Sequence, residues 1–503
     1  MDATRTRLPG LTALLALVFL VACGDDDTSS SVASNASNGA TSAADAGDSQ
    51  DTSVTADTGE GVDTAVADTA MNEDTGAPDS GADVEPDAPE ETCVEEQLGG
   101  FWEEAAALEL PITGQPIIRG TLQATIESLD GEPDLVLDEP RLAYIIDTGT
   151  QITSYNARLT GGSVAFFQGD VVEFDTLRLC EPVVKGRAIA DFEAFVGVDV
   201  DVFLGQSMLM QLYTTIDYRN LLAWLYPAAP DSPPPTMEAE TPSVLSYALQ
   251  NQFPVSQVGF GVTLTGSLLE RGEMEEACQP PGCCTEASCP LLMDTGSEAT
   301  VITQTLFDQI EADYGEPLPK LQGYQWVTNL GRDEAFVTRL PSLQLGDGEV
   351  SGEWAVVVPD AYHVRAVLEG NGVVIEGFVG YPHFRHFLTE FRGPDSEFRF
   401  WPYPDDAHVP TDTWRRVGVD VIGSEAGPVV EMVFSPSDAA TQGVTRGDRL
   451  VSVDGAEVVD MNANAVRLLL MGTPGETRTL ELERDGEAVT VEVMIEDLLP
   501  PLP

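Results

Sequence analysis

The chain has 503 residues, more than a single hydrophobic core usually accommodates, so we expect several modules. It carries 84 acidic residues against 24 basic ones, which gives a formal net charge of -60. This charge repels nucleic-acid phosphates at close range, so the composition excludes DNA and RNA as partners.

Residues 1–22 have the order of an export signal, because Arg5 and Arg7 precede an apolar run from Leu11 to Ala22. The run is too short to predict a membrane-spanning helix. Its end, LVAC, resembles the lipobox of bacterial lipoproteins, whose cysteine, here Cys23, becomes lipid-modified after cleavage. The resemblance implies an exported protein anchored by lipid to the cell envelope. Gly24, the residue after the cysteine, is consistent with sorting to the outer membrane by the same resemblance. An ordinary signal peptide with an incidental cysteine is the alternative.

Residues 23–92 are rich in Ala, Asp, Ser, Thr and Gly, and they contain no Lys or Arg. Such a segment cannot bury enough apolar surface to offset its chain entropy. We expect a disordered acidic tether.

Two later segments run from an apolar stretch into the same triplet, Asp-Thr-Gly. They are LAYIIDTGTQITSY at 142–155 and CPLLMDTGSEATVI at 289–302. The triplet alone is a weak signal, since two more copies begin at Asp57 and Asp74 in the tether without an apolar stretch before them. Each later copy is followed by a second shared element, VFLG from Val202 and GFVG from Gly377, which precedes a short helix and a strand.

The residues around both triplets alternate between polar and apolar, which predicts strands and hairpins. We therefore predict a mainly β fold with two tandem lobes at 93–228 and 243–404. The proline-rich stretch at 229–242 cannot form a central strand, because proline lacks a ladder donor, and we expect a linker there. "Lobe 1" and "lobe 2" denote these two ranges below.

The order of triplet and glycine element resembles the retropepsin and pepsin superfamily of aspartic peptidases. The resemblance implies that Asp147 and Asp294 are the catalytic pair. It further implies that the triplet threonines tie the lobes together and that the next hydroxyl steadies each carboxylate. These supporting residues are Thr148, Gly149 and Thr150 in lobe 1 and Thr295, Gly296 and Ser297 in lobe 2. One chain supplies both half-sites, so the active unit is expected to be a monomer.

Two carboxylates about 3 Å apart cannot easily ionise together, so they share one proton over a useful pH range. One can then take a proton from water while the other gives one to a carbonyl oxygen. This chemistry needs no cofactor and no metal, and we expect none.

Gly-containing turns between strand-like runs mark two hairpins that are candidates for flaps over the substrate. Their tips are Gln168, Gly169 and Asp170 in lobe 1 and Asn329, Leu330, Gly331 and Arg332 in lobe 2. Plain surface hairpins are the alternative.

Six cysteines remain besides Cys23, an even number in an exported chain, so disulfides are expected. Four lie in one insertion, which favours two local bridges among Cys278, Cys283, Cys284 and Cys289 over a zinc site. Cys93 and Cys180 form the third candidate pair.

Residues 413–497 contain RRVGVDV, PVVEMVFSPSDAATQGVTRGDRLVSVDGAEV and TRTLELERDGEAVTVEVM, which resemble a bacterial protease-associated PDZ domain. PDZ domains add an extended peptide, often with a free C-terminus, as a strand at a sheet edge. The candidate carboxylate-binding loop is Val417, Gly418 and Val419. A PDZ fold that only packs on the lobes is the alternative.

Together these patterns predict an envelope-anchored aspartic endopeptidase whose PDZ domain recruits or positions a protein substrate. The alternative is a catalytically inactive scaffold that binds a peptide or a partner protein without cutting it.

Overall fold

The computed structural model of the chain describes its strands and helices mainly beyond residue 105. The described residues are 96–97, 105–111, 113–128, 135–160, 166–169, 171–174, 177–180, 183–187, 190–230, 237, 241–264, 283–328, 330–403 and 413–503. The predicted signal peptide, Cys23, the tether and most of the linker lie outside these ranges.

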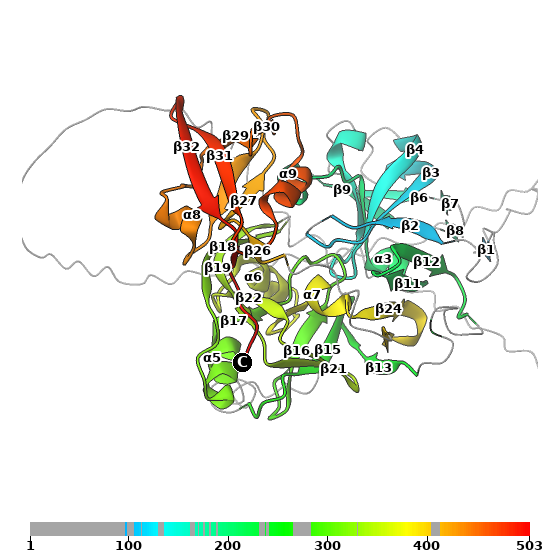
Figure 1. Ribbon diagram of the computed structural model, residues 1–503. Helices are drawn as coiled ribbons and strands as arrows, with labels where there is room; N and C mark the ends of the chain where they lie inside the picture. Colours follow the sequence, from blue (N-terminus) through cyan, green and yellow to red (C-terminus); the bar gives the residue numbers. More distant parts are fainter. Residues whose placement is uncertain are drawn as a thin grey trace, which may run out of the picture. The chain divides into compact units, whose positions relative to one another are not determined.

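Strands dominate the described part of the chain, which confirms the prediction of a mainly β fold with several sheets (Figure 1). The elements of lobe 1 are β1 (Glu96–Gln97), β2 (Ala106–Glu109), β3 (Ile117–Ser128), β4 (Leu135–Ile146), β5 (Thr153–Asn156), η2 (Ala157–Thr160), β6 (Phe166–Gly169), β7 (Val171–Phe174), β8 (Leu177–Cys180), β9 (Val183–Arg187), α2 (Ala190–Val196), β10 (Val202–Leu204), α3 (Gln206–Leu209), β11 (Tyr213–Asp217) and β12 (Leu222–Tyr226).

Lobe 2 repeats this order of strands and short helices. Its elements are β13 (Ser243–Ser246), β14 (Ala248–Gln250), β15 (Phe253–Gly259), β16 (Ser288–Met293), β17 (Val301–Thr303), α5 (Gln304–Tyr314), β18 (Leu321–Thr328), β19 (Gly331–Arg339), β20 (Ser342–Leu345), β21 (Gly348–Ser351), β22 (Trp354–Val358), α6 (His363–Gly370), β23 (Gly377–Val379), α7 (Tyr381–Phe384), β24 (Phe387–Arg392), η4 (Gly393–Asp395) and β25 (Glu397–Pro402).

The two lobes share a local pattern of strand pairing around their triplets. In lobe 1, β10 pairs parallel with β4 and antiparallel with β5. In lobe 2, β23 pairs parallel with β16 and antiparallel with β17. The glycine element therefore lies between the strand before the triplet and the strand after it in both lobes.

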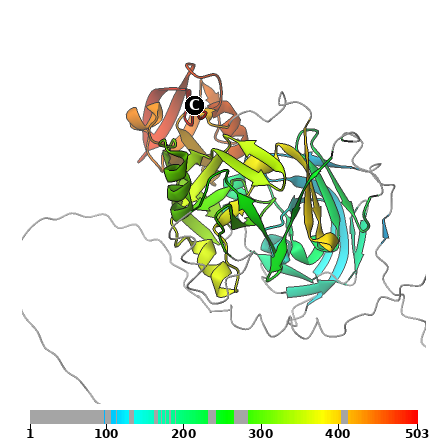
Figure 2. The ribbon, with the colours of Figure 1, turned by 90° about the horizontal axis from the view of Figure 1, so that it is seen from below.

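A single sheet crosses from one lobe to the other, because β11 of lobe 1 pairs antiparallel with β24 of lobe 2. The yellow strands of lobe 2 lie beside the green strands of lobe 1 in Figure 2. Buried residues of both lobes, such as Leu204 and Val379, belong to one apolar cluster. The two triplets are therefore held on a continuous framework.

Helix α5 shows how local sequence sets an element of lobe 2. The hydroxyl of Thr303 accepts a hydrogen bond from the Leu306 amide and caps the helix start. Gly315 ends the helix in the left-handed conformation at a φ of 81°, which glycine adopts without strain. Leu306, Phe307 and Ile310 are buried, so one face of the helix packs on the lobe.

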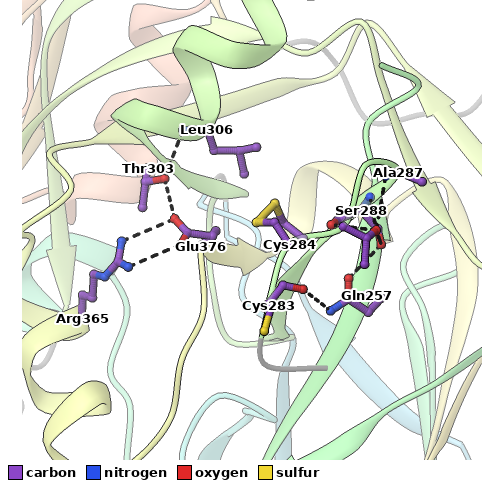
Figure 3. Close-up of a disulfide and its surroundings, with 11 residues drawn as sticks. Gln257, Cys283, Cys284, Ala287, Ser288, Thr303, Leu306, Arg365 and Glu376 are labelled. Atoms are coloured by element: carbon purple, nitrogen blue, oxygen red, sulfur yellow. Dashed lines mark hydrogen bonds and ion pairs between the residues drawn. A yellow bond between two sulfur atoms is a disulfide. The ribbon is translucent and has the colours of Figure 1, made fainter. Parts of the chain in front are cut away.

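The cysteine-rich insertion of lobe 2 contains one bridge between described residues, Cys284–Cys289 (Figure 3). Cys283 is disulfide-bonded as well. Its carbonyl accepts a hydrogen bond from the Gln257 side chain at 2.9 Å, which ties the insertion to β15. Cys93 and Cys278 lie outside the described residues, and only the backbone of Cys180 is described.

The described part of the C-terminal module forms a six-stranded sheet and a separate two-stranded sheet, with two helices beside them (Figure 1). Its elements are β26 (Arg415–Arg416), β27 (Val419–Ile422), β28 (Val429–Val433), α8 (Asp438–Thr441), β29 (Arg449–Val453), β30 (Ala456–Glu457), α9 (Ala463–Leu470), β31 (Thr477–Arg484), β32 (Glu487–Met494) and β33 (Glu496–Asp497).

The module is packed firmly on lobe 2. Trp414 and Phe434 belong to the same buried cluster as Trp354 of lobe 2. The guanidinium of Arg339 in β19 donates to the carbonyl of Leu499, beyond the last strand, at 2.6 Å. The module therefore adds to the core of lobe 2 instead of hanging from a free linker.

Candidate active site

Each predicted catalytic aspartate follows a buried strand and is fixed by the neighbouring glycine element. The Asp147 amide donates to the carbonyl of Leu204, and the Asp294 amide donates to the carbonyl of Val379, both at 3.0 Å. The same backbone bond therefore positions both residues, although they stand in different lobes.

Each glycine element ends in a glycine, Gly205 or Gly380, because a side chain at that position would clash with the backbone of the same lobe. A Cβ at Gly205 would lie 2.7 Å from the carbonyl oxygen of Thr150. A Cβ at Gly380 would lie 2.2 Å from the carbonyl oxygen of Ala299. Neither contact is tolerable for a side chain, which explains why the hydrophobic pair is followed by glycine in both lobes.

The triplet threonines interlock across the lobes. The Thr148 amide donates to Oγ1 of Thr295 at 3.2 Å, and the Thr295 amide donates to Oγ1 of Thr148 at 3.0 Å. The Thr148 hydroxyl donates to the carbonyl of Met293 at 2.6 Å, and that of Thr295 to the carbonyl of Ile146 at 2.7 Å. Because both threonines are fully buried, these four bonds fix the lobes against each other.

The two carboxyl groups face the glycine of the opposite triplet. A Cβ at Gly149 would lie 2.2 Å from Cγ of Asp294, and a Cβ at Gly296 would lie 2.6 Å from Cγ of Asp147. The side chains of Asp147 and Asp294 also share a hydrogen bond. The structure thus brings the two residues together at one point.

The surroundings of the two carboxyl groups differ. Asp147 accepts hydrogen bonds from the Gly149 amide at 2.9 Å and from the Thr150 hydroxyl at 2.7 Å, which favour its ionised form. Burial, the charge of Asp147 and their shared hydrogen bond raise the pKa of Asp294 well above its usual range. The two carboxyl groups therefore share one proton, and the raised pKa of Asp294 favours its protonated form.

Ser297 differs from the role that the resemblance implied. Its hydroxyl donates to the carbonyl of Ala299 at 2.8 Å, whereas the matching Thr150 hydroxyl donates to Asp147. Serine lacks the second Cβ substituent that restricts threonine, so its hydroxyl turns more freely toward a nearby carbonyl. The carboxylate of Asp294 does accept the amide of Gly296 at 2.9 Å.

A cavity of about 210 Å³ opens over the pair. Asp147 and Asp294 lie on its wall, and much of the remaining lining is apolar. The apolar lining residues include Phe192, Phe203, Phe253, Trp326, Val364 and Phe378. Such a lining excludes water and suits the apolar side chains of a bound chain.

A third carboxyl group lines this cavity and was not anticipated from the sequence. Glu298 is 7% exposed, and the Tyr324 hydroxyl donates to its Oε1 at 2.6 Å. Burial raises the pKa of Glu298 to about 8. The sequence places Glu298 directly after Ser297 and so next to the predicted active-site turn. Its partner Tyr324 lies on the separate strand β18, and this contact could not be predicted from the sequence.

The residues predicted as flap tips do not all lie at the cavity. Leu330 lines the cavity at the turn between β18 and β19, whereas Arg332 forms an ion pair with Glu431 of the C-terminal module. Gly331 begins β19 beside the His363 ring, and Asn329 lies outside the described residues. Gln168 and Gly169 are described only as backbone of β6, and Asp170 is outside the described residues.

The candidate loop of the C-terminal module is buried. Val417 and Val419 are 0% exposed, and a Cβ at Gly418 would lie 2.2 Å from the Ser437 side chain. The Val417 amide donates to the carbonyl of Leu470, and the Val419 amide donates to the carbonyl of Val417. A carboxylate-binding role for this loop stays a prediction.

Among the residues that the structure describes, no group of three or more His, Cys, Asp or Glu side chains could hold a metal ion. The spacing of His383 and His386 does not make such a site, since His383 contacts Thr300 and His386 contacts Glu353. In the described part of the chain, no helix has both the length and the apolar character needed to span a membrane.

Residues 416–495 match the family model of the PDZ domain, which confirms the predicted identity of the C-terminal module. The chain is 44% identical over 66 residues to a putative zinc metalloprotease of Mesorhizobium japonicum and 29% identical over 100 residues to the regulator of sigma-E protease RseP of Escherichia coli. These matches cover 13% and 20% of this chain. The chain spans only 17% and 21% of the length of these relatives.

Solved structures give two kinds of similarity. The PDZ domain of a carboxy-terminal protease from Vibrio cholerae, in complex with peptide, is 20% identical, with a TM-score of 0.15, and covers 16% of this chain and 92% of its own. An aspartic proteinase from Irpex lacteus is 8% identical, with a TM-score of 0.35, over 61% of this chain and 98% of its own. Basic 7S globulin from soybean is 10% identical, with a TM-score of 0.33, over 59% and 94%.

Proposed function

We propose that this protein is an aspartic endopeptidase that hydrolyses peptide bonds with Asp147 and Asp294. The observation that carries the proposal is the pairing of these carboxyl groups, each against the glycine of the opposite triplet, beneath a largely apolar cavity. The relatives that match the PDZ region are themselves named as proteases. The zinc type named for the relative from Mesorhizobium japonicum is not carried over to this chain, because the match covers only 13% of the chain.

The unequal surroundings of the pair support a different role for each aspartate. Two hydrogen bonds hold Asp147 in its ionised form. Asp147 takes a proton from a water molecule, and the oxygen of that water attacks the carbonyl carbon of the peptide bond. Asp294 gives its own proton to the carbonyl oxygen, so a neutral tetrahedral intermediate forms. When the C–N bond breaks, the nitrogen takes up the proton held by Asp147, and the intermediate's hydroxyl returns a proton to Asp294.

We further propose that the enzyme is exported and held at the cell envelope by lipid on Cys23, with residues 24–92 as its tether. Its substrates are proteins or peptides that enter the cleft in an extended conformation. One chain contains both half-sites, which supports a monomeric active unit. We also propose that the PDZ domain recruits or positions the protein substrate.

One observation favours the alternative of an inactive peptide-binding scaffold. The Ser297 hydroxyl is turned away from Asp294, so the second half-site lacks a bond that the first half-site has. Such a scaffold would bind peptides in the cavity and release them uncut.

One assay distinguishes the endopeptidase from the inactive peptide-binding scaffold. The full chain and its Asp294→Asn variant are incubated with a peptide library from acidic to neutral pH, and products are sought by mass spectrometry. The proposal predicts products from the parent chain alone. Saturable binding without products at any pH would favour the scaffold.

A further inference from the structure

The free edge of the PDZ sheet is the place where a peptide would bind. Among the described strands, β27 pairs only with β28, so its other edge, called the β27 edge below, is where strand addition would occur. This edge consists of the backbone amides and carbonyls of Val419, Val421 and Gly423, which are not hydrogen-bonded to β28. The amides of all three residues and the carbonyls of Val419 and Val421 already have partners within the chain.

Side chains of the PDZ domain itself close most of the edge. The Arg416 guanidinium donates to the carbonyl of Val419 at 2.7 Å, and the Arg467 guanidinium donates to that of Val421 at 2.9 Å. The Val421 amide donates to the Asp420 carboxylate at 2.6 Å. Arg467 is fully buried, so its position on α9 is fixed by packing as well as by charge.

Helix α2 of lobe 1 closes the remaining end. The Gly423 amide donates to the carbonyl of Ala194 at 2.9 Å. Arg467 donates to the carbonyl of Val196 at 3.3 Å, and its guanidinium lies 5.2 Å from the centre of the Phe195 ring. A Cβ at Gly197, just past the helix, would lie 2.4 Å from the Asn464 amide nitrogen at the start of α9. The helix thus contacts both elements that flank a PDZ ligand.

The same helix forms part of the wall of the aspartate cavity. Phe192 is 8% exposed and lines the cavity together with Asp147 and Asp294. Its ring packs against Phe203, with the ring centres 5.1 Å apart. A movement of α2 away from the PDZ domain would therefore also move a wall of the cavity.

We propose that helix α2 is a resident partner of the PDZ domain, and that a peptide with a free C-terminus binds the β27 edge only by displacing it together with the Arg416, Asp420 and Arg467 side chains that close the rest of the edge. Displacement withdraws Phe192 from the cavity and so couples occupation of the PDZ domain to the shape of the cleft. The apparent affinity for such a peptide is lowered by the small fraction of chains with α2 undocked. This inference does not depend on whether the aspartates cut peptides.

A disulfide between α2 and the β27 edge tests the proposal. A Cβ at Gly423 lies 3.9 Å from the Cα of Ala194, close enough for a bridge in the double variant Ala194→Cys, Gly423→Cys. The full chain also carries Asp294→Asn, so that probe peptides stay intact. The probe is a library of random extended peptides ending in a free carboxylate, with the amidated library as control. The variant before oxidation is the matched control for the bridged form.

The proposal predicts that the bridge forms on oxidation, as detected by mass spectrometry. Carboxylate-ending peptides bind the unbridged form, and binding to the bridged form is weaker by about 10-fold or more. Their binding also speeds amide hydrogen exchange in residues 190–196. Failure of the bridge to form, equal binding to both forms, no binding to either form, or binding without faster exchange in α2 would each overturn it.

Discussion

Thr148 and Thr295 each donate a backbone amide to the other's hydroxyl oxygen, at 3.2 and 3.0 Å, although 147 residues separate them. This reciprocal pair holds the two aspartates together, because each threonine directly follows one of them.

Replacing Thr295 by Val removes a hydroxyl but keeps the side-chain shape. The Thr148 amide and the Ile146 carbonyl lose their partner inside the protein, at a cost of about 2 kcal/mol for each unsatisfied group. We expect a lower free energy of unfolding in urea and weaker cleavage. Thr295→Ser keeps the hydroxyl and is expected to restore most of both. A Thr295→Val variant as stable and as active as the parent chain would contradict the role given to the hydroxyl.

Replacing Gly149 by Ala tests how closely the two half-sites approach. The new methyl group would lie 2.2 Å from Cγ of Asp294, so that carboxyl must shift. A displacement of this size is expected to lower kcat by about 100-fold. Gly370→Ala is the matched control, since a Cβ there meets nothing within 4 Å. Full activity in the Gly149 variant would contradict the described geometry.

Glu298 is expected to make stability depend on pH. Its folded pKa of about 8 exceeds the reference value of 4.5, so the folded chain binds this proton more tightly than the unfolded chain. The resulting stabilisation is complete below pH 4.5 and is lost as pH rises to about 8. In Glu298→Gln this loss is absent, so the difference in unfolding free energy between parent and variant should change across that range. A constant difference would be evidence against a buried, protonated Glu298.

Glu353 is expected to show the opposite dependence. Burial alone would raise its pKa, but His386 and Arg385 outweigh this effect and hold it at about 2. The stabilisation is therefore present above the reference value of 4.5 and is lost as pH falls toward 2.

Glu353→Gln deprives the buried Arg385 of its carboxylate partner and should cost about 3 kcal/mol at neutral pH. Thermal unfolding measures this cost, with the exposed Glu349→Gln as control. Equal melting temperatures for the two variants would contradict the role given to the buried pair.

The sequence predicted the parts of the site that have a local signal. An apolar strand before each triplet and a hydrophobic pair followed by glycine predicted where the strands lie, because both patterns reflect burial and close backbone approach. The PDZ domain was predicted from its own strings in the same way.

Contacts between distant segments left no such signal. The pairing of Glu298 with Tyr324 and the docking of α2 near Arg467 depend on how separate elements meet. The orientation of the Ser297 hydroxyl was also beyond prediction, because serine and threonine offer the same donor and only the local rotamer decides its partner.

Peptide cleavage in the presence of a metal chelator is the most direct test of catalysis by Asp147 and Asp294. The full chain, Asp147→Asn and Asp294→Asn are compared for kcat/KM on one peptide substrate in EDTA, after circular dichroism has shown that all three are folded. We expect the parent chain to keep its activity in EDTA and the kcat/KM of each variant to fall by about 1,000-fold or more. Loss of the parent's activity in EDTA, or undiminished cleavage by either variant, would contradict catalysis by the two aspartates.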